Sequence, residues 1–180
     1  MLVAFGDSLS AGFGVEAGLS YPDFLQKEID AKQLGYRVVN QGISGDTTSS
    51  GVSRIGSALA LKPRVVILEL GGNDGLRGLP LSQTRANLNT MIERFTAGGA
   101  RVVIAGMTLP PNYGPDYVKQ FESIYTDLAR QHKLTRMPFL LEGVWNAPGM
   151  MQADGIHATA KGNAEVARRV MRLVEPLLRP

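Results

Sequence analysis

Short strand-like stretches alternate with helix-like stretches along the whole chain, and this alternation constrains the fold more than any other feature. The clearest strand-like stretch, Val65–Leu70, is apolar nearly throughout, as in parallel strands that are covered on both faces. Short strands that are joined by helices must pair in parallel. The predicted strands are Leu2–Phe5, Tyr36–Val39, Val65–Leu70, Arg101–Gly106 and Pro138–Leu141. The pattern predicts an α/β fold, a flavodoxin-like three-layer α/β/α arrangement around a five-stranded parallel sheet in the order 2-1-3-4-5.

Helix signals follow each predicted strand. Ser20 with Pro22 and Asp23 is a start signal, because a serine cap and an acid three residues later satisfy each other's backbone N–H groups. The predicted helices run from Ser20 to Gly35, from Thr48 to Leu61, from a Ser82 cap to Gly98, from about Asp116 to His132 and from about Thr159 to Leu178. The segments Gly6–Leu19 and Gly71–Asp74 are predicted to be loops.

Length and charge limit the architecture and the partners. The 180 residues suffice for one sizeable core and are too few for two, so we expect a single domain over residues 1–180. The formal charge is only +3 and the arginines are scattered, so we expect no nucleic-acid binding. No apolar run approaches the roughly 20 residues that cross a bilayer, so we expect no stable membrane insertion. A monomer or a small homo-oligomer is expected.

Residue content also limits the chemistry. The absence of cysteine removes disulfides, thiolate metal sites and cysteine nucleophiles together, and the two histidines and the acidic residues show no metal-ligand spacing. We therefore expect neither a metal nor a cofactor. The stretch Met1–Gly6 has no charged region followed by an apolar signal segment, so the sequence as given shows no export signal and leaves a cytoplasmic location open.

A serine stands in the loop that follows the first predicted strand. Leu2–Phe5 breaks into Gly6-Asp7-Ser8, and the carboxyl ends of parallel strands border the ligand crevice in folds of this class. A serine hydroxyl is a weak nucleophile, so it needs a general base within hydrogen-bond reach and donors for the oxyanion that forms. Ser8 is therefore the candidate nucleophile around which other groups should gather.

Asp154 and His157 stand three residues apart in the long loop before the last predicted helix. In a serine hydrolase an imidazole takes the serine proton, and an acid fixes the tautomer of the imidazole and stabilises the imidazolium. This loop can thus supply His157 as base and Asp154 as orienting acid. Taken alone, the segment Asp154–His157 fits a turn with a surface histidine better than it fits a catalytic acid and base.

Three candidate oxyanion donors follow different predicted strands: the backbone N–H of Ser8, the loop at Gly45 and the side-chain amide of Asn73. Neutral donors suit this task, because they stabilise charge that appears only in the transition state. Gly45 and Asn73 are each also ordinary turn residues. Asp7 and Asp46 are expected to make capping or loop hydrogen bonds.

Four blocks together resemble the SGNH/GDSL hydrolases. Gly6–Ser10 is similar to the block that bears the nucleophile of that family, Ile43–Thr47 to its oxyanion-glycine block, Gly71–Asp74 to its oxyanion-asparagine block, and Asp154–His157 to its acid and base. The blocks keep the order of the family over almost the whole chain. The resemblance implies catalytic residues Ser8, Asp154 and His157 and an oxyanion hole of Ser8, Gly45 and Asn73.

Gly72–Leu79 and Leu109–Gly114 look most like bacterial enzymes described as acyl-thioesterase, lysophospholipase and arylesterase. This similarity implies a metal-free serine esterase, periplasmic or secreted, that hydrolyses aryl esters, acyl-CoA thioesters and lysophospholipids through an acyl-enzyme. One departure is Ala158, where that group usually has proline after the histidine. Proline would stiffen the segment that carries His157.

Two apolar loops are expected to flank Ser8 and form an acyl groove. The predicted substrate-binding residues are Leu76, Leu79, Leu109, Pro110 and Tyr113. Trp145, Met150 and Met151 fit an acyl site and core packing equally well.

Two other functions stay open. A carbohydrate acetylesterase would use the same residues, since acetyl esters of sugars need the same acyl transfer. A flavodoxin-like nucleotide-binding module is disfavoured, because the first loop lacks the glycine spacing and the final lysine of a phosphate-binding fingerprint. The expected partner is a small acyl ester or thioester.

Overall fold

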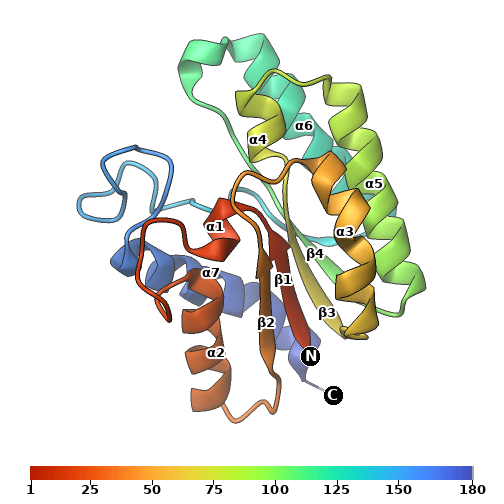
Figure 1. Ribbon diagram of the computed structural model, residues 1–180, viewed down its shortest axis with the longest axis vertical. Coiled ribbons are helices and arrows are strands. Elements are labelled where there is room, and N and C mark those ends of the chain that lie inside the picture. Colours follow the sequence, from red (N-terminus) through yellow and green to blue (C-terminus); the bar gives the residue numbers. More distant parts are fainter. Residues whose placement is uncertain (180) are drawn as a thin grey trace.

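The computed structural model describes residues 1–179 and is built on one parallel sheet. Its strands are β1 Leu2–Gly6, β2 Val38–Gly42, β3 Val65–Glu69, β4 Arg101–Ala105 and β5 Thr135–Met137. They lie in the order β2-β1-β3-β4-β5, of which Figure 1 labels the first four. The predicted fold class and strand order are confirmed.

Helices cover both faces of the sheet and complete three layers. One face carries α2 Tyr21–Ala31 and α7 Ala160–Leu178, and the other carries α3 Thr48–Ala60, α5 Leu81–Ala97 and α6 Pro115–His132 (Figure 1). Every residue of the central strands β1 and β3 is buried, because both faces of these strands are covered. Gly6 at the end of β1 lies opposite Gly42 of β2 and Glu69 of β3, so the loops that leave these strands meet at one edge of the sheet.

Two helix starts show how local chemistry fixes the elements. The predicted capping box of α2 is confirmed: Ser20 Oγ accepts from the Asp23 N–H, and the Asp23 carboxylate accepts from the Ser20 N–H. The predicted Ser82 cap of α5 is wrong. Helix α5 begins at Leu81, and the Pro80 carbonyl accepts the first helical hydrogen bond, from Thr84 N–H at 3.1 Å.

The fifth strand lies three residues before the predicted one. Pro138–Leu141 is a turn and not a strand, because Pro138 has no N–H for a ladder and the Leu140 N–H turns back to the Gly106 carbonyl at 3.0 Å. Within this turn Leu140 and Leu141 are buried in the core, Phe139 is partly buried against it, and Pro138 is exposed. Two predicted loops also contain short helices, α1 Ser8–Ala11 and α4 Gly72–Leu76, and the stretch before α6 holds the 3₁₀ helix η1 Pro111–Tyr113.

Candidate active site

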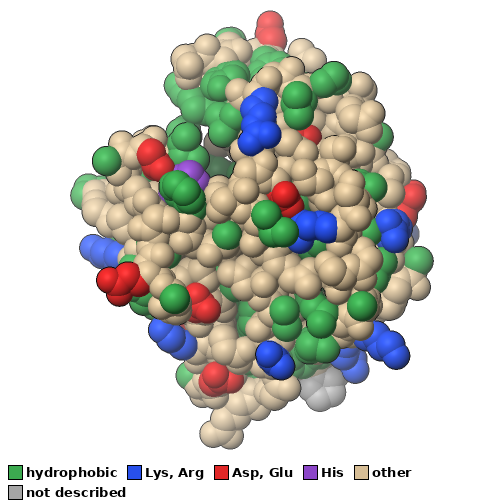
Figure 2. All heavy atoms as spheres, in the orientation of Figure 1, with side chains coloured by type: hydrophobic (Ala, Val, Ile, Leu, Met, Phe, Trp, Pro, Cys, Tyr) green, Lys and Arg blue, Asp and Glu red, His purple; other side chains and the backbone are tan. Residues whose placement is uncertain are grey.

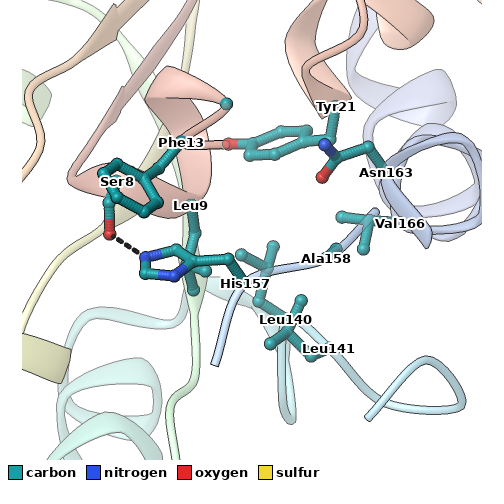
Figure 3. Close-up of a pocket in the computed structure, with 11 residues that line it drawn as sticks. Ser8, Leu9, Phe13, Tyr21, Leu140, Leu141, His157, Ala158, Asn163 and Val166 are labelled. Carbon is teal, nitrogen blue, oxygen red and sulfur yellow. Dashed lines mark hydrogen bonds between the residues drawn. The ribbon is translucent and has the colours of Figure 1, made fainter. Parts of the chain in front are cut away.

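Ser8, His157 and Asp154 meet at the carboxyl edge of the sheet. His157 Nε2 lies 2.8 Å from Ser8 Oγ (Figure 3), and His157 Nδ1 lies 2.6 Å from Asp154 Oδ2. Ser8 is the first residue of α1, whose N-cap Asp7 accepts a hydrogen bond from the Leu9 N–H at 3.0 Å. The expected capping role of Asp7 is thus confirmed. The arrangement can move a proton from the serine hydroxyl to the imidazole.

Hydrogen bonds hold Asp154 as an anion. Its Oδ1 accepts the backbone N–H groups of Ile156 at 2.9 Å and His157 at 3.0 Å, while Oδ2 faces the imidazole. Partial burial raises the pKa of Asp154, but these hydrogen bonds together outweigh burial and lower the pKa to about 2. The carboxylate can therefore accept the Nδ1 proton of His157 at neutral pH, which leaves Nε2 free to act as a base.

Gln152 ties the histidine loop to the serine loop. Its backbone N–H donates to the His157 carbonyl at 2.8 Å, and its side-chain amide donates to the carbonyls of Ala158 at 2.9 Å and Phe13 at 2.8 Å. Met151 and Ala158 also form an antiparallel bridge. The backbone beside His157 is thus held by hydrogen bonds at the position where the similar enzymes usually have proline.

The three predicted oxyanion donors lie on one cavity. It has a volume of about 240 Å³, and Ser8, Gly45, Asn73 and His157 all line it. Asn73 Nδ2 donates to the Asp46 carbonyl at 2.9 Å and lies 3.2 Å from Asp7 Oδ2. These contacts orient the Asn73 amide beside the nucleophile.

Two arginines hold the loop that carries Gly45. The Arg54 guanidinium pairs with the Asp46 carboxylate at 2.5 Å, and it donates to the Gly6 carbonyl at 2.8 Å. Arg77 donates to the Gly45 carbonyl at 3.1 Å. Gly45 itself has a φ of 86°, which favours glycine over any residue with a side chain.

A second, apolar cavity of about 60 Å³ adjoins the first. The two share Leu9, Gly72, Leu76, Met107 and Ile156. The second is completed by Thr108, Pro110, Phe139, Leu141, Trp145 and Gly155. A third space behind Ser8 and His157 (Figure 3) is only about 10 Å³, room for no more than one water.

Only some of the predicted substrate-binding residues line the apolar cavity. Leu76 and Pro110 line it, whereas Leu79, Leu109 and Tyr113 line neither cavity beside Ser8. Leu79 is exposed, Leu109 is buried beneath Gly75, and the Tyr113 hydroxyl donates to the Leu76 carbonyl at 2.8 Å. A loop has no regular periodicity, so the sequence cannot show which of its apolar side chains face Ser8.

Several lining residues escaped the sequence interpretation. Met107 is the second residue after β4, as Ser8 is the second residue after β1, and this placement could have identified it. Phe139 and Leu141 lie in the run Pro138–Leu141, for which the sequence predicts a strand. Trp145 lines the cavity, whereas Met150 and Met151 pack partly buried against the core.

Two exposed apolar side chains lie at the larger cavity. Phe13 and Ile156 both line it and are 51% and 41% exposed, and the Phe13 ring lies 4.6 Å from the His157 ring, centroid to centroid. Figure 2 shows hydrophobic side chains around a hollow beside a histidine. The entrance therefore suits a substrate with an apolar part.

Within residues 1–179, no group of three histidine or acidic side chains is placed to hold a metal ion. In the same part of the chain, none of the helices combines the length and the apolar character that a membrane crossing requires.

Comparison with known proteins identifies the family. The profile of the GDSL-like Lipase/Acylhydrolase family matches residues 4–165. Esterase TesA of Pseudomonas aeruginosa is 44% identical over 98% of this chain and 89% of its own. Thioesterase 1/protease 1/lysophospholipase L1 of Escherichia coli K12 is 37% identical over 98% of this chain and 84% of its own. A crystal structure of TesA, 44% identical, superposes with a TM-score of 0.93 over 98% of both chains. The resemblance predicted from the sequence is confirmed: this chain belongs to the GDSL-like lipase and acylhydrolase family and is a carboxylic ester hydrolase.

Proposed function

We propose that the chain hydrolyses acyl esters and thioesters through an acyl-enzyme on Ser8, with His157 as general base and Asp154 as its orienting acid. The observation that carries this proposal is the pair of hydrogen bonds from Ser8 through His157 to Asp154, at 2.8 and 2.6 Å. Both distances lie within the reach that proton transfer requires.

In the proposed reaction His157 Nε2 takes the hydroxyl proton while Ser8 Oγ bonds to the carbonyl carbon of the substrate. The tetrahedral intermediate then collapses, the bond from carbon to the leaving oxygen or sulfur breaks, and His157 gives its proton to the leaving alcohol or thiol. Water attacks the acyl-enzyme by the same two steps and releases the carboxylic acid and free Ser8.

The oxyanion of each intermediate would lie in the larger cavity. The backbone N–H groups of Ser8 and Gly45 and the side-chain amide of Asn73 are the proposed donors, and all three residues line that cavity. Losing one such donor typically lowers kcat by about 10²–10³-fold.

The adjoining apolar cavity would take the start of the acyl chain. Its lining is almost wholly apolar, and it shares a wall with the cavity that holds Ser8. Each methylene buried there contributes about 0.8 kcal/mol, roughly fourfold in kcat/KM when the contact is kept in the transition state. This favours medium acyl chains over the acetyl group of a carbohydrate acetylesterase. Measurement of kcat/KM for nitrophenyl esters from acetate upwards, beside acetylated xylan, separates these two substrate classes.

Ser8→Ala tests the whole mechanism. Turnover of nitrophenyl butyrate and of an acyl-CoA should fall by several orders of magnitude, because only binding and the oxyanion donors would remain. A fluorophosphonate should label the parent on the peptide with Ser8, and should fail to label the variant. The matched control is Ser123→Ala, an exposed serine of α6 whose loss should change neither result. Near-parental turnover in a folded Ser8→Ala protein would contradict the proposal.

A further inference from the structure

A second acidic side chain, Glu69, lies directly beneath the nucleophile turn. It ends β3, is completely buried, and belongs to neither cavity beside Ser8. Its Oε2 accepts hydrogen bonds from Ser10 Oγ at 2.7 Å and from the Asp7 N–H at 3.2 Å. A Cβ on Gly6 would lie only 2.3 Å from this oxygen, so the glycine leaves the room that the Glu69 carboxyl group fills.

Asp7 is the partner of Glu69 and reaches the catalytic groups on its other side. Its backbone N–H donates to Glu69 Oε2 at 3.2 Å, and its own carboxyl group is buried close enough to that of Glu69 for its charge to raise the Glu69 pKa. It also accepts the Leu9 N–H at 3.0 Å and lies 3.2 Å from Asn73 Nδ2. Asp7 therefore connects Glu69 to the turn that presents Ser8 and to the proposed oxyanion amide.

Two adjacent buried carboxyl groups cannot both be charged at low cost, and sharing one proton removes most of the repulsion. Burial, and next the charge of Asp7, raise the pKa of Glu69 well above its ordinary value. Glu69 Oε1 is buried and has no hydrogen-bond partner among residues 1–179. An ionised Glu69 would leave a charged oxygen unsolvated there, whereas a protonated one avoids this cost.

The other ionisable groups near Asp7 and Glu69 do not supply a charge that would take the place of the shared proton. Tyr21 of α2 is hydrogen-bonded to Ser10 Oγ at 3.1 Å, and Tyr125 of α6 donates to the Leu70 carbonyl at 2.9 Å. Burial raises the pKa of both tyrosines, and the carboxylate charges add to this, so both hydroxyls stay neutral. His157 faces Asp7 from the opening, and Arg54 of α3 is already paired with Asp46.

We propose that Glu69 is a buried carboxylic acid that shares one proton with the Asp7 carboxylate, and that this pair positions the Ser8 turn and the Asn73 amide for ester hydrolysis. Its positioning role rests on the roles proposed above for Ser8 and Asn73. Glu69 touches no substrate and acts only through Asp7 and Ser10.

The proton is tested without any substrate. The infrared spectrum of the parent near pH 7 should show the C=O stretch of a protonated carboxyl group, and Glu69→Gln should lose that band. The control is Glu93→Gln, an exposed acid of α5, which should keep it. A parent spectrum without the band, or a band that persists in Glu69→Gln, would overturn the proposal.

Stability against pH gives a second readout. The folded-state pKa of Glu69 lies above its ordinary value of 4.5. The stabilisation that protonated Glu69 gives the folded protein is therefore fully present below pH 4.5, and it is lost as the pH rises through the folded-state pKa. As the pH rises above 5, the parent should lose stability that Glu69→Gln keeps. The free energy of unfolding of Glu69→Gln should therefore increase relative to that of the parent. A difference that is constant from pH 5 to 9 would show that Glu69 carries no extra proton. If Glu69→Gln does not fold, the parent spectrum alone decides the question.

Kinetics tests the positioning. Glu69→Gln keeps a neutral donor and acceptor, so kcat at neutral pH should stay within about threefold of the parent. Asp7→Asn removes the anion and should lower kcat by about 10- to 100-fold with little change in KM. Unchanged kcat in a folded Asp7→Asn protein would refute the positioning role. An active Ser8→Ala protein beside a confirmed carboxyl band would instead refute the proposed mechanism and leave the shared proton intact.

Discussion

At the scale of single residues, two carboxyl groups near the same serine have opposite environments. Asp154 keeps 37% of its side chain exposed and accepts two backbone N–H groups. Glu69 is completely buried, and in the described part of the chain one of its oxygens has no hydrogen-bond partner. Hydrogen bonds favour the charged form and burial favours the neutral form. The pKa of Asp154 is therefore lowered and that of Glu69 is raised.

Asp154→Asn should lower kcat by about 10⁴-fold, because the amide can turn its N–H towards His157 Nδ1 and hold the imidazole in the wrong tautomer. Steady-state kinetics with nitrophenyl butyrate measures this, with Asp127→Asn on α6 as the exposed control. A loss below tenfold would show that Asp154 does not orient the base.

The same variant should respond differently to acid. The folded-state pKa of Asp154, about 2, lies below its ordinary value of 3.8, so the stability that it contributes is present above pH 3.8 and is lost as pH falls towards 2. Unfolding of Asp154→Asn should thus be less sensitive to pH between 4 and 2. Denaturant titrations at pH 2, 3 and 4 compare the two proteins, and parallel curves would contradict the assignment.

At the scale of elements, the catalytic contact joins the first residue of the short helix α1 to the long loop before α7. Ser8 and His157 are 149 positions apart in sequence, and the Gln152 side chain bonds to both of their loops, through Phe13 and Ala158. The contact between base and nucleophile therefore depends on the relative position of these loops.

Gln152→Ala should lower kcat by about tenfold while the fold is kept, because it removes two hydrogen bonds worth about 0.5–1.5 kcal/mol each. KM should change little, since Gln152 lines neither cavity beside Ser8. Gln120→Ala, at an exposed position of α6, is the control. If kcat is unaltered and only the melting temperature falls, Gln152 is structural alone.

At the scale of the whole molecule, the apolar cavity is assembled from the ends of several strands and from distant loops. Trp145 is its outer wall, because this side chain also lines two open grooves on the far side, beside α6 and β5. Removing the indole should join the cavity to these grooves.

Trp145→Ala should therefore shift the acyl-chain optimum to longer esters. Each further methylene that finds apolar contact adds about fourfold to kcat/KM. The measurement is kcat/KM for nitrophenyl esters from butyrate to palmitate. Leu177→Ala, at a half-buried position of α7 remote from the cavity, is the control. An unchanged profile in Trp145→Ala would place the acyl chain elsewhere.

The sequence by itself determined what depends on neighbouring residues. Apolar runs and helix periodicity placed four of the five strands and the five longer helices, and the strand order followed from the rules for parallel sheets. The Ser20 capping box and the three-residue spacing of Asp154 and His157 are also local, so they could be predicted before any contact was known. These patterns involve residues that are close in sequence, so they can be recognised without knowledge of the tertiary contacts.

Only the tertiary structure decided what depends on distant residues. The burial of Glu69, the residues that line the acyl cavity and the inward turn of Leu109 follow from packing between segments far apart in sequence. The local pattern predicts a strand at Pro138–Leu141, but the edge strand β5 ends at Met137, and Leu140 and Leu141 are buried in a turn instead. An apolar residue is buried equally well by a strand, a turn or a cavity wall, and only the neighbouring segments select among these.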